Sequence, residues 1–112
     1  MANERRPPRG GPTEPQLITI YWRDIPAQVM ARAGAEKARA ALGSRFQTAI
    51  HRAAAKAGKN PTDHSLEEWR EERSPCAGDV ESELDAAMRR LERQFPDEVL
   101  NERVRNAGWA DR

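Results

Sequence analysis

The residues best suited to chemistry or recognition fall into two short stretches of the chain, 21–24 and 69–70. The first reads Tyr-Trp-Arg-Asp and the second Trp-Arg, so each joins an aromatic ring to a guanidinium group. Trp, Tyr and Arg are among the residue types that most often anchor protein interfaces. The pattern therefore predicts an interaction surface made of five residues: Tyr21, Arg23, Asp24, Trp69 and Arg70.

The first stretch also has a purely structural interpretation. Trp22 would then be a core residue, Arg23 would be solvated, and Asp24 would hold a hairpin turn by bonding its own downstream backbone. The hypothesis of a site predicts that changing Arg23 and Asp24 together to Ala leaves folding nearly intact and abolishes partner binding. Unfolding of the double variant would indicate that both residues are structural.

Groups that could perform catalysis or hold a metal are few. Cys76 is the single cysteine, which excludes an internal disulfide and a multi-thiolate metal site. His51 and His64 add two possible ligands, but the spacing of the three residues matches no known metal-binding pattern. A glycine-rich phosphate loop is missing, because the pair Gly10 and Gly11 lies in a Pro-rich segment. We therefore expect a protein that is not an enzyme and has no cofactor.

The charge is unevenly distributed along the chain. Residues 1–59 carry 11 Lys and Arg against 4 Asp and Glu, a net +7, whereas residues 60–112 carry 8 against 14, a net −6. Two halves of opposite charge can attract each other within one fold. Alternatively, Arg45, Arg52 and Lys56 could line one helix face and follow a phosphate backbone, which makes nucleic-acid binding by the basic face of the predicted 44–57 helix the second hypothesis.

The ends of the chain are predicted to lie outside the folded domain. Residues 1–15 contain four Pro and two Gly and almost nothing apolar, so they are expected to form a disordered tail. A single domain is then predicted over 16–108, with a C-terminal tail at 109–112. No apolar stretch approaches the length of about 20 residues that spans a bilayer. The N-terminal segment lacks the apolar core of a secretory signal. We expect a cytoplasmic protein without membrane contact.

The elements that position the interaction surface begin with a hairpin. The segment 16–23 has β-branched and aromatic residues on both faces, which predicts a strand inside a sheet. A turn is predicted at 24–26, where Pro removes a backbone donor, and 27–31 returns as an antiparallel strand. The segment 33–41 has helix formers but too few large apolar residues, so a loop or a short helical turn is expected there.

Two helices are predicted beyond the hairpin. The segment 44–57 has an apolar stripe at helical spacing, with Ser44 and Gln47 as a capping box and Gly58 at the position after the helix. The segment 79–95 has a second stripe: Val80, Leu84, Ala87, Met88, Leu91 and Phe95. Pro96 ends this helix and can start a short third one.

The segment 64–72 fits either a helix or a strand. Ser65 and Glu68 suit a capping box, but a lone hairpin needs a further partner, so the strand is favoured. A break is predicted at Ser74 and Pro75. The expected fold is α+β: a β-hairpin joined by a third strand and covered on one face by two helices.

Three motifs together resemble a known family. The chain is similar to the bacterial virulence factor domain family in these motifs: Tyr-Trp-Arg-Asp-Ile-Pro-Ala-Gln-Val at 21–29, Arg-Phe-Gln at 45–47 followed by Ile50 and Ala53, and Trp-Arg at 69–70. The resemblance covers residues 17–95 of this chain. The chain also resembles the C-terminal domain of conserved virulence factor C-type proteins. The chain departs from the family at Ser65, where an aromatic residue, usually Tyr, is expected.

The resemblance implies a bacterial, cytoplasmic accessory protein. Some members are fused to a domain similar to the N-terminal part of iron–sulfur scaffold proteins. Others are encoded beside one-carbon or corrinoid methyltransferase genes. The family thus implies a protein partner of one of these kinds, and we expect an uncharacterised, non-enzymatic interaction module.

Overall fold

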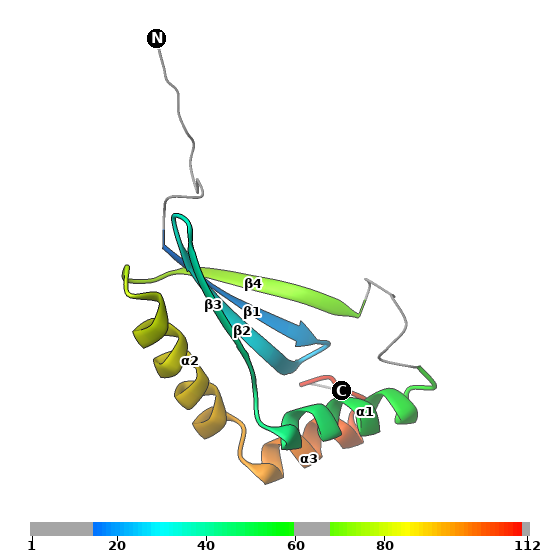
Figure 1. The fold of residues 1–112 in the computed structure, drawn as a ribbon. Helices are drawn as coiled ribbons and strands as arrows, with labels where there is room; N and C mark the ends of the chain where they lie inside the picture. The colour runs from blue at the N-terminus through cyan, green and yellow to red at the C-terminus, as the bar shows by residue number, and fades with distance from the viewer. Residues whose placement is uncertain (1–14, 60–67, 111–112) are drawn as a thin grey trace.

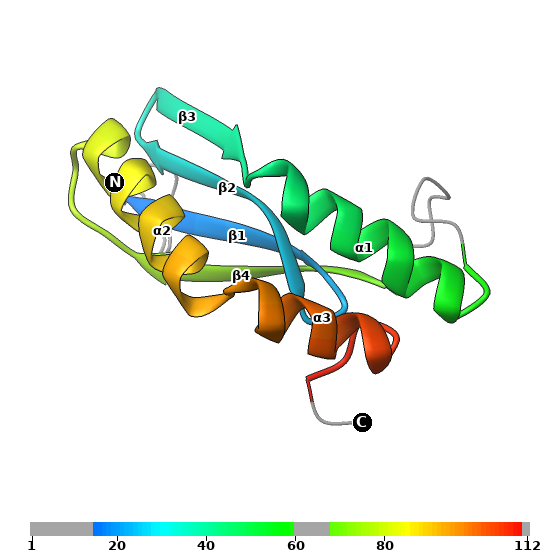
Figure 2. The ribbon, with the colours of Figure 1, turned by 90° about the horizontal axis from the view of Figure 1, so that it is seen from below.

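The computed structural model describes residues 15–59 and 68–110, and these form one antiparallel sheet with three helices. The strands lie in the order β3-β2-β1-β4, and the helices lie together on one side of the sheet (Figures 1 and 2). The predicted α+β class is confirmed, with one more strand and one more helix than the minimum expected. The elements are β1 Gln16–Trp22, β2 Ile25–Ala33, β3 Glu36–Ala41, α1 Ser44–Lys56, β4 Trp69–Pro75, α2 Val80–Gln94 and α3 Asp97–Arg105.

The first strand lies inside the sheet, as its apolar residues on both faces predicted. β1 pairs antiparallel with β2 on one side and with β4 on the other. The predicted turn at 24–26 is wrong by one to two residues, because Arg23 and Asp24 form the turn and Ile25 already pairs with Trp22. Pro26 is accommodated in β2 because a register shift interrupts the regular ladder beside it.

The segment 33–41 is not a loop, and this expectation is corrected. It contains β3, which pairs with β2 after a turn at Gly34, whose φ is +61°. The strand has no large apolar residue because it is an edge strand whose inner face meets α2. Small side chains such as Ala38 let the helix lie close to this edge, so pairing and packing override the weak strand propensity of Ala.

The predicted helix at 44–57 is confirmed as α1, with its apolar stripe buried against the core. Gly58 follows it at φ +72°, as predicted for that position. The predicted capping box at Ser44 is wrong, because Gly43 is the N-cap and no side chain of the first turn caps it. Instead, the Gly43 N–H donates to Glu92 Oε2 of α2 at 3.2 Å. A carboxylate from another element therefore replaces the local cap.

The favoured strand in the segment 64–72 is confirmed from Trp69 onward, whereas 64–67 lies outside the described residues. The predicted break at Ser74 and Pro75 is wrong, since β4 continues to Pro75, which lies opposite Gln16. Pro is tolerated there because β4 is an edge strand and Pro75 is its last residue.

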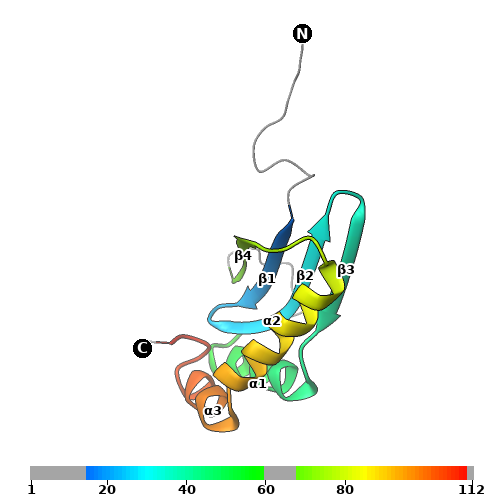
Figure 3. The ribbon, with the colours of Figure 1, turned by 90° about the vertical axis from the view of Figure 1, so that its left-hand side faces the viewer.

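The predicted helix at 79–95 is confirmed as α2, with Asp79 as its N-cap. It packs against β2 and β3, whereas α3 packs against α1 near the β1–β2 turn (Figure 3). The short third helix begins after Pro96, which is the N-cap rather than the first helical residue. The predicted apolar stripe faces the core: its buried residues are Val80, Ala87, Leu91 and Phe95, and its partly buried residues are Leu84 and Met88.

Candidate interaction site

The pairing of β1 with β4 brings the two predicted stretches together. Tyr21 lies opposite Arg70, and Trp22 lies opposite Trp69. Residues directly opposite each other share a sheet face, so Trp22 and Trp69 lie on one face and Tyr21 and Arg70 on the other. Trp22 is 1% exposed, which confirms its predicted place in the core.

Arg23 is almost fully enclosed, with 10% of its side chain exposed. Its backbone adopts φ +53°, and its Nε donates to Glu68 Oε1 at 2.6 Å. Its Nη1 donates to the Ala107 carbonyl at 2.7 Å. The guanidinium also lies 5.0 Å from the ring centroids of both Trp22 and Trp109. Arg23 therefore joins the hairpin turn to the segment that follows α3.

Asp24 fastens the same segment from the other side of the turn. Its Oδ2 accepts from the Ala110 N–H at 2.8 Å, and its own N–H donates to the Gly108 carbonyl at 2.8 Å. Gly108 has φ +101°, and a Cβ atom there would lie 2.8 Å from the Trp22 ring. The backbone after α3 is thus held against the turn by close packing as well as hydrogen bonds.

Glu68 links the end of α1 to the start of β4. Besides Arg23, its carboxylate contacts Lys59, with Nζ 3.3 Å from Oε2. The hydrogen bond from Arg23 is the main cause that lowers the pKa of Glu68, and the bond from Lys59 adds to it against the opposing effect of burial. The carboxylate is therefore held in its charged form beside the Arg23 guanidinium.

Arg70 is the exposed member of the group, with 41% of its side chain accessible. Its guanidinium lies 4.5 Å from the centroid of the Tyr21 ring, and Nη1 contacts Asp24 Oδ1 at 3.0 Å. It also donates to the Arg23 carbonyl and to Glu72. Burial is the main cause that raises the pKa of Tyr21, which keeps the phenol neutral under the stacked guanidinium.

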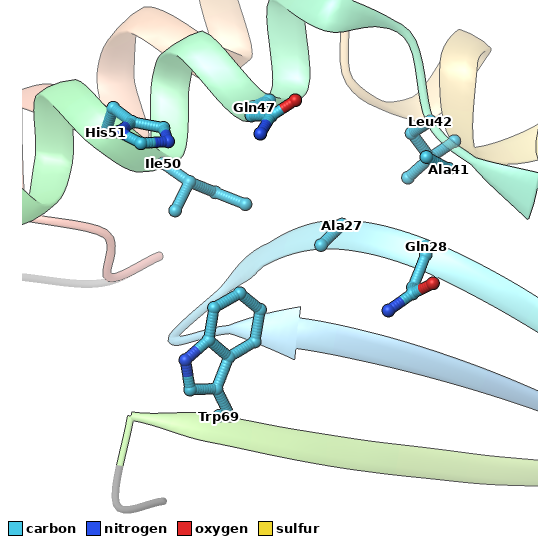
Figure 4. A pocket seen from close by; sticks show the side chains of 8 residues that line it. All are labelled: Ala27, Gln28, Ala41, Leu42, Gln47, Ile50, His51 and Trp69. Atoms are coloured by element: carbon cyan, nitrogen blue, oxygen red, sulfur yellow. The ribbon is translucent and has the colours of Figure 1, made fainter. Parts of the chain in front are cut away.

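Trp69 lines an open cavity of about 280 Å³ between the sheet and α1. Figure 4 shows its indole rising from β4 toward Ile50 and His51 of α1. Sequence reasoning missed the polar residues of this cavity, because residues on β2 and α1 give no local sign that Trp69 lies opposite them. The described residues that line it are Ala27, Gln28, Ala41, Leu42, Gln47, Ile50, His51 and Trp69.

The basic face predicted on the first helix is only partly free. Arg45 donates to the Phe95 carbonyl at 2.6 Å and contacts Glu92 Oε1 at 2.9 Å, and it also pairs with Asp97. It therefore fastens α1 to the junction of α2 and α3. Arg52 and Lys56 of α1 are exposed.

The remaining reactive residues do not assemble into a second site in the described ranges. No group of three or more His, Cys, Asp and Glu residues there could hold a metal ion. His51 is exposed, and His64 lies outside the described residues. Burial raises the pKa of the partly buried Cys76 thiol. Of the helices in 15–59 and 68–110, none is long and apolar enough to cross a membrane.

Comparison with known proteins gives one match. The family described as Virulence factor matches residues 20–104, from the middle of β1 to the last turn of α3. No curated protein and no solved structure matches the chain. The family match includes the hairpin turn, the cavity and all five residues of the predicted surface. The chain therefore belongs to the virulence factor family.

Proposed function

We propose that this virulence factor domain is a non-enzymatic interaction module of the bacterial cytoplasm that binds a protein partner through one corner of its sheet. The β4 corner consists of Tyr21, Asp24, Trp69 and Arg70, at the end of β1, in the turn that follows it and at the start of β4. The observation that carries the proposal is the exposed Arg70 guanidinium stacked on Tyr21 and paired with Asp24, next to the half-buried Trp69. Arg and aromatic residues in such clusters supply most interface energy.

The contacts of Arg70 favour binding because they hold the side chain in one position. An Arg that is already ordered by a ring, a carboxylate and a carbonyl loses less conformational freedom when a partner docks. Arg23, which the sequence placed in the same surface, acts from beneath the corner. Its enclosed side chain positions Asp24 and the turn, so its contribution to binding is indirect.

The resemblance to the family supports a partner from iron–sulfur assembly or from one-carbon or corrinoid methyl transfer. A nucleic-acid partner would use Arg52 and Lys56, and is less supported because Arg45 is occupied by Glu92 and Asp97.

The test is a tagged pull-down from the native host with washes at low salt and at roughly 0.3 M salt, where phosphate contacts weaken steeply. Wild type is compared with Arg70→Ala and with a matched control, Arg73→Ala. Arg73 lies on the same strand, is half exposed, and pairs with Glu71 much as Arg70 pairs with Glu72. A protein partner kept by wild type and Arg73→Ala but lost by Arg70→Ala would support the proposal.

Two results would contradict the proposal. Equal capture by Arg70→Ala and wild type would show that the β4 corner is not the contact surface. Nucleic acid released by the salt wash, without a protein partner, would support the alternative. That binding should then fall in an Arg52→Ala, Lys56→Ala double variant.

A further inference from the structure

We infer that the cavity between α1 and the sheet receives one uncharged aromatic side chain of the partner polypeptide. The inference rests on the proposed function, since it names the group by which a partner at the β4 corner is anchored. It assigns a binding role to residues outside that corner, chiefly Ile50, Gln47 and His51 of α1.

The size of the cavity limits what can enter. Its volume of about 280 Å³ lies just below the range of roughly 300–1,000 Å³ typical of ligand pockets. A space of this size suits a single large side chain better than an extended cofactor. Figure 4 shows that it lies between α1 above and the strands below, with Trp69 rising into it.

The lining determines the chemistry of the occupant. Among the lining residues in 15–59 and 68–110 there is no Asp, Glu, Lys or Arg, so a charged group entering the cavity would lose water without gaining a counter-charge from them. Ile50 and Leu42 are buried, and with Ala27 and Trp69 they provide an apolar surface. An uncharged occupant is therefore favoured over an acidic or basic one.

The ring of Trp69 favours an aromatic occupant over an aliphatic one. Aromatic pairs attract each other beyond the effect of the apolar area that they bury. The polar lining residues Gln28, Gln47 and His51 provide amide and imidazole groups that can bond a phenol, an indole N–H or a peptide group. Gln47 and His51 are exposed, so these groups are accessible from solvent.

The cavity and the β4 corner are continuous through Trp69. Trp69 and Arg70 are neighbours in one strand, so their side chains point to opposite faces of the sheet. β4 is an edge strand, and no other strand of the described residues pairs with its outer side, where a partner segment can cross from one face to the other. A partner segment can therefore place an aromatic ring in the cavity and contact Arg70 beyond the edge.

The experiment is an NMR titration of the full chain with small probes that carry one side chain between blocked ends. The probes are N-acetyl-tyrosinamide, N-acetyl-leucinamide and N-acetyl-aspartamide with a free side-chain carboxylate. The reporters are the Trp69 indole N–H, assigned with Trp69→Phe, and the Ile50 methyl groups. We expect the tyrosine probe to shift both reporters in a saturable way, the leucine probe to bind at least about threefold more weakly, and the charged probe to leave both unchanged.

A variant that partly fills the cavity tests the same inference. Ala41 is an exposed lining residue at the end of β3, so Ala41→Leu adds volume at the cavity without disturbing the buried core. Its matched control is Ala55→Leu, at an exposed position of α1 that does not line the cavity. We expect the affinity for the tyrosine probe to fall roughly tenfold in Ala41→Leu and to stay unchanged in the control. Gln47→Glu, which places a charge at the cavity, should weaken the same probe if Ala41→Leu fails to fold.

Several results would overturn the inference. They are the absence of shifts at Trp69 and Ile50, equal binding of the tyrosine and leucine probes, and equal effects of Ala41→Leu and Ala55→Leu. Failure of these tests while partner capture still depends on Arg70 would reject the anchor and leave the proposed function standing. Probe binding without any Arg70-dependent capture would reject the proposed surface instead.

Discussion

The enclosed Arg23 allows a sharp test of how the turn is held. We predict that Arg23→Ala lowers the free energy of unfolding by about 3 kcal/mol, near the lower end of the cost of breaking a buried ion pair. The change removes the bond to Glu68 and the bond to the Ala107 carbonyl. It also removes the contacts with two indole rings. The expected loss of unfolding free energy lies near the lower end of that cost because Lys59 still neutralises Glu68 in the variant.

A second variant separates the side chain from the backbone. Arg23 has φ +53°, a conformation that costs an L-residue with a Cβ atom about 1–2 kcal/mol and costs Gly almost nothing. Arg23→Gly should therefore be about 1 kcal/mol more stable than Arg23→Ala, after the greater freedom of Gly in the unfolded chain is counted.

The assay is equilibrium urea unfolding followed by circular dichroism, with the same slope required for all variants. Arg52→Ala is the control, because Arg52 is exposed on α1 and its loss should change stability by no more than about 0.5 kcal/mol. A loss below about 1 kcal/mol in Arg23→Ala would refute the reasoning, since an ordinary surface Arg costs no more than this. Such a result would indicate that Arg23 is available for direct contact with a partner.

Three further perturbations test the contacts around the turn and the helix ends. Gly108→Ala should cost about 2 kcal/mol or more in urea unfolding, because it adds strain at φ +101° and a Cβ atom against an indole ring. The pKa of Glu68 is below its ordinary value of 4.5, so its stabilising effect is complete above that pH and is lost as the pH falls through the lowered pKa. Wild type should therefore lose more stability than Glu68→Gln between pH 5 and more acidic conditions, and parallel losses would contradict this. Glu92→Ala removes one acceptor of Arg45 and the acceptor of the N–H of Gly43, the N-cap of α1, and should cost about 1–2 kcal/mol by calorimetry, whereas an unchanged melting temperature would contradict the capping role.

Much of the fold could be predicted from local patterns in the sequence. The helical stripes of 44–57 and 79–95 identified α1 and α2 because an amphipathic helix repeats its apolar residues every three or four positions. Apolar residues on both faces identified β1 as an inner strand. The same reasoning failed to predict β3. Its alanines form a strand only because β2 supplies hydrogen bonds and α2 supplies a surface.

The candidate site was predictable in its residue types and not in their roles. The two stretches at 21–24 and 69–70 contain the Arg and aromatic residues that meet at the β4 corner. Their exposure depends on what covers them. Arg23 and Arg70 look equivalent in sequence, yet the segment after α3 encloses the first and leaves the second accessible. The polar residues of the cavity come from β2 and α1 and carry no local signal of Trp69.

The sequence by itself determined the periodic elements, the family and the aromatic and Arg residues of the corner. Only the tertiary structure decided that 36–41 forms β3, how α1 is capped and that Arg23 is enclosed. The physical reason is the range of the interactions. Periodicity and turn chemistry act over a few residues, whereas Arg23 meets partners 45 and 84 positions away, and such contacts exist only once the whole chain has closed around them.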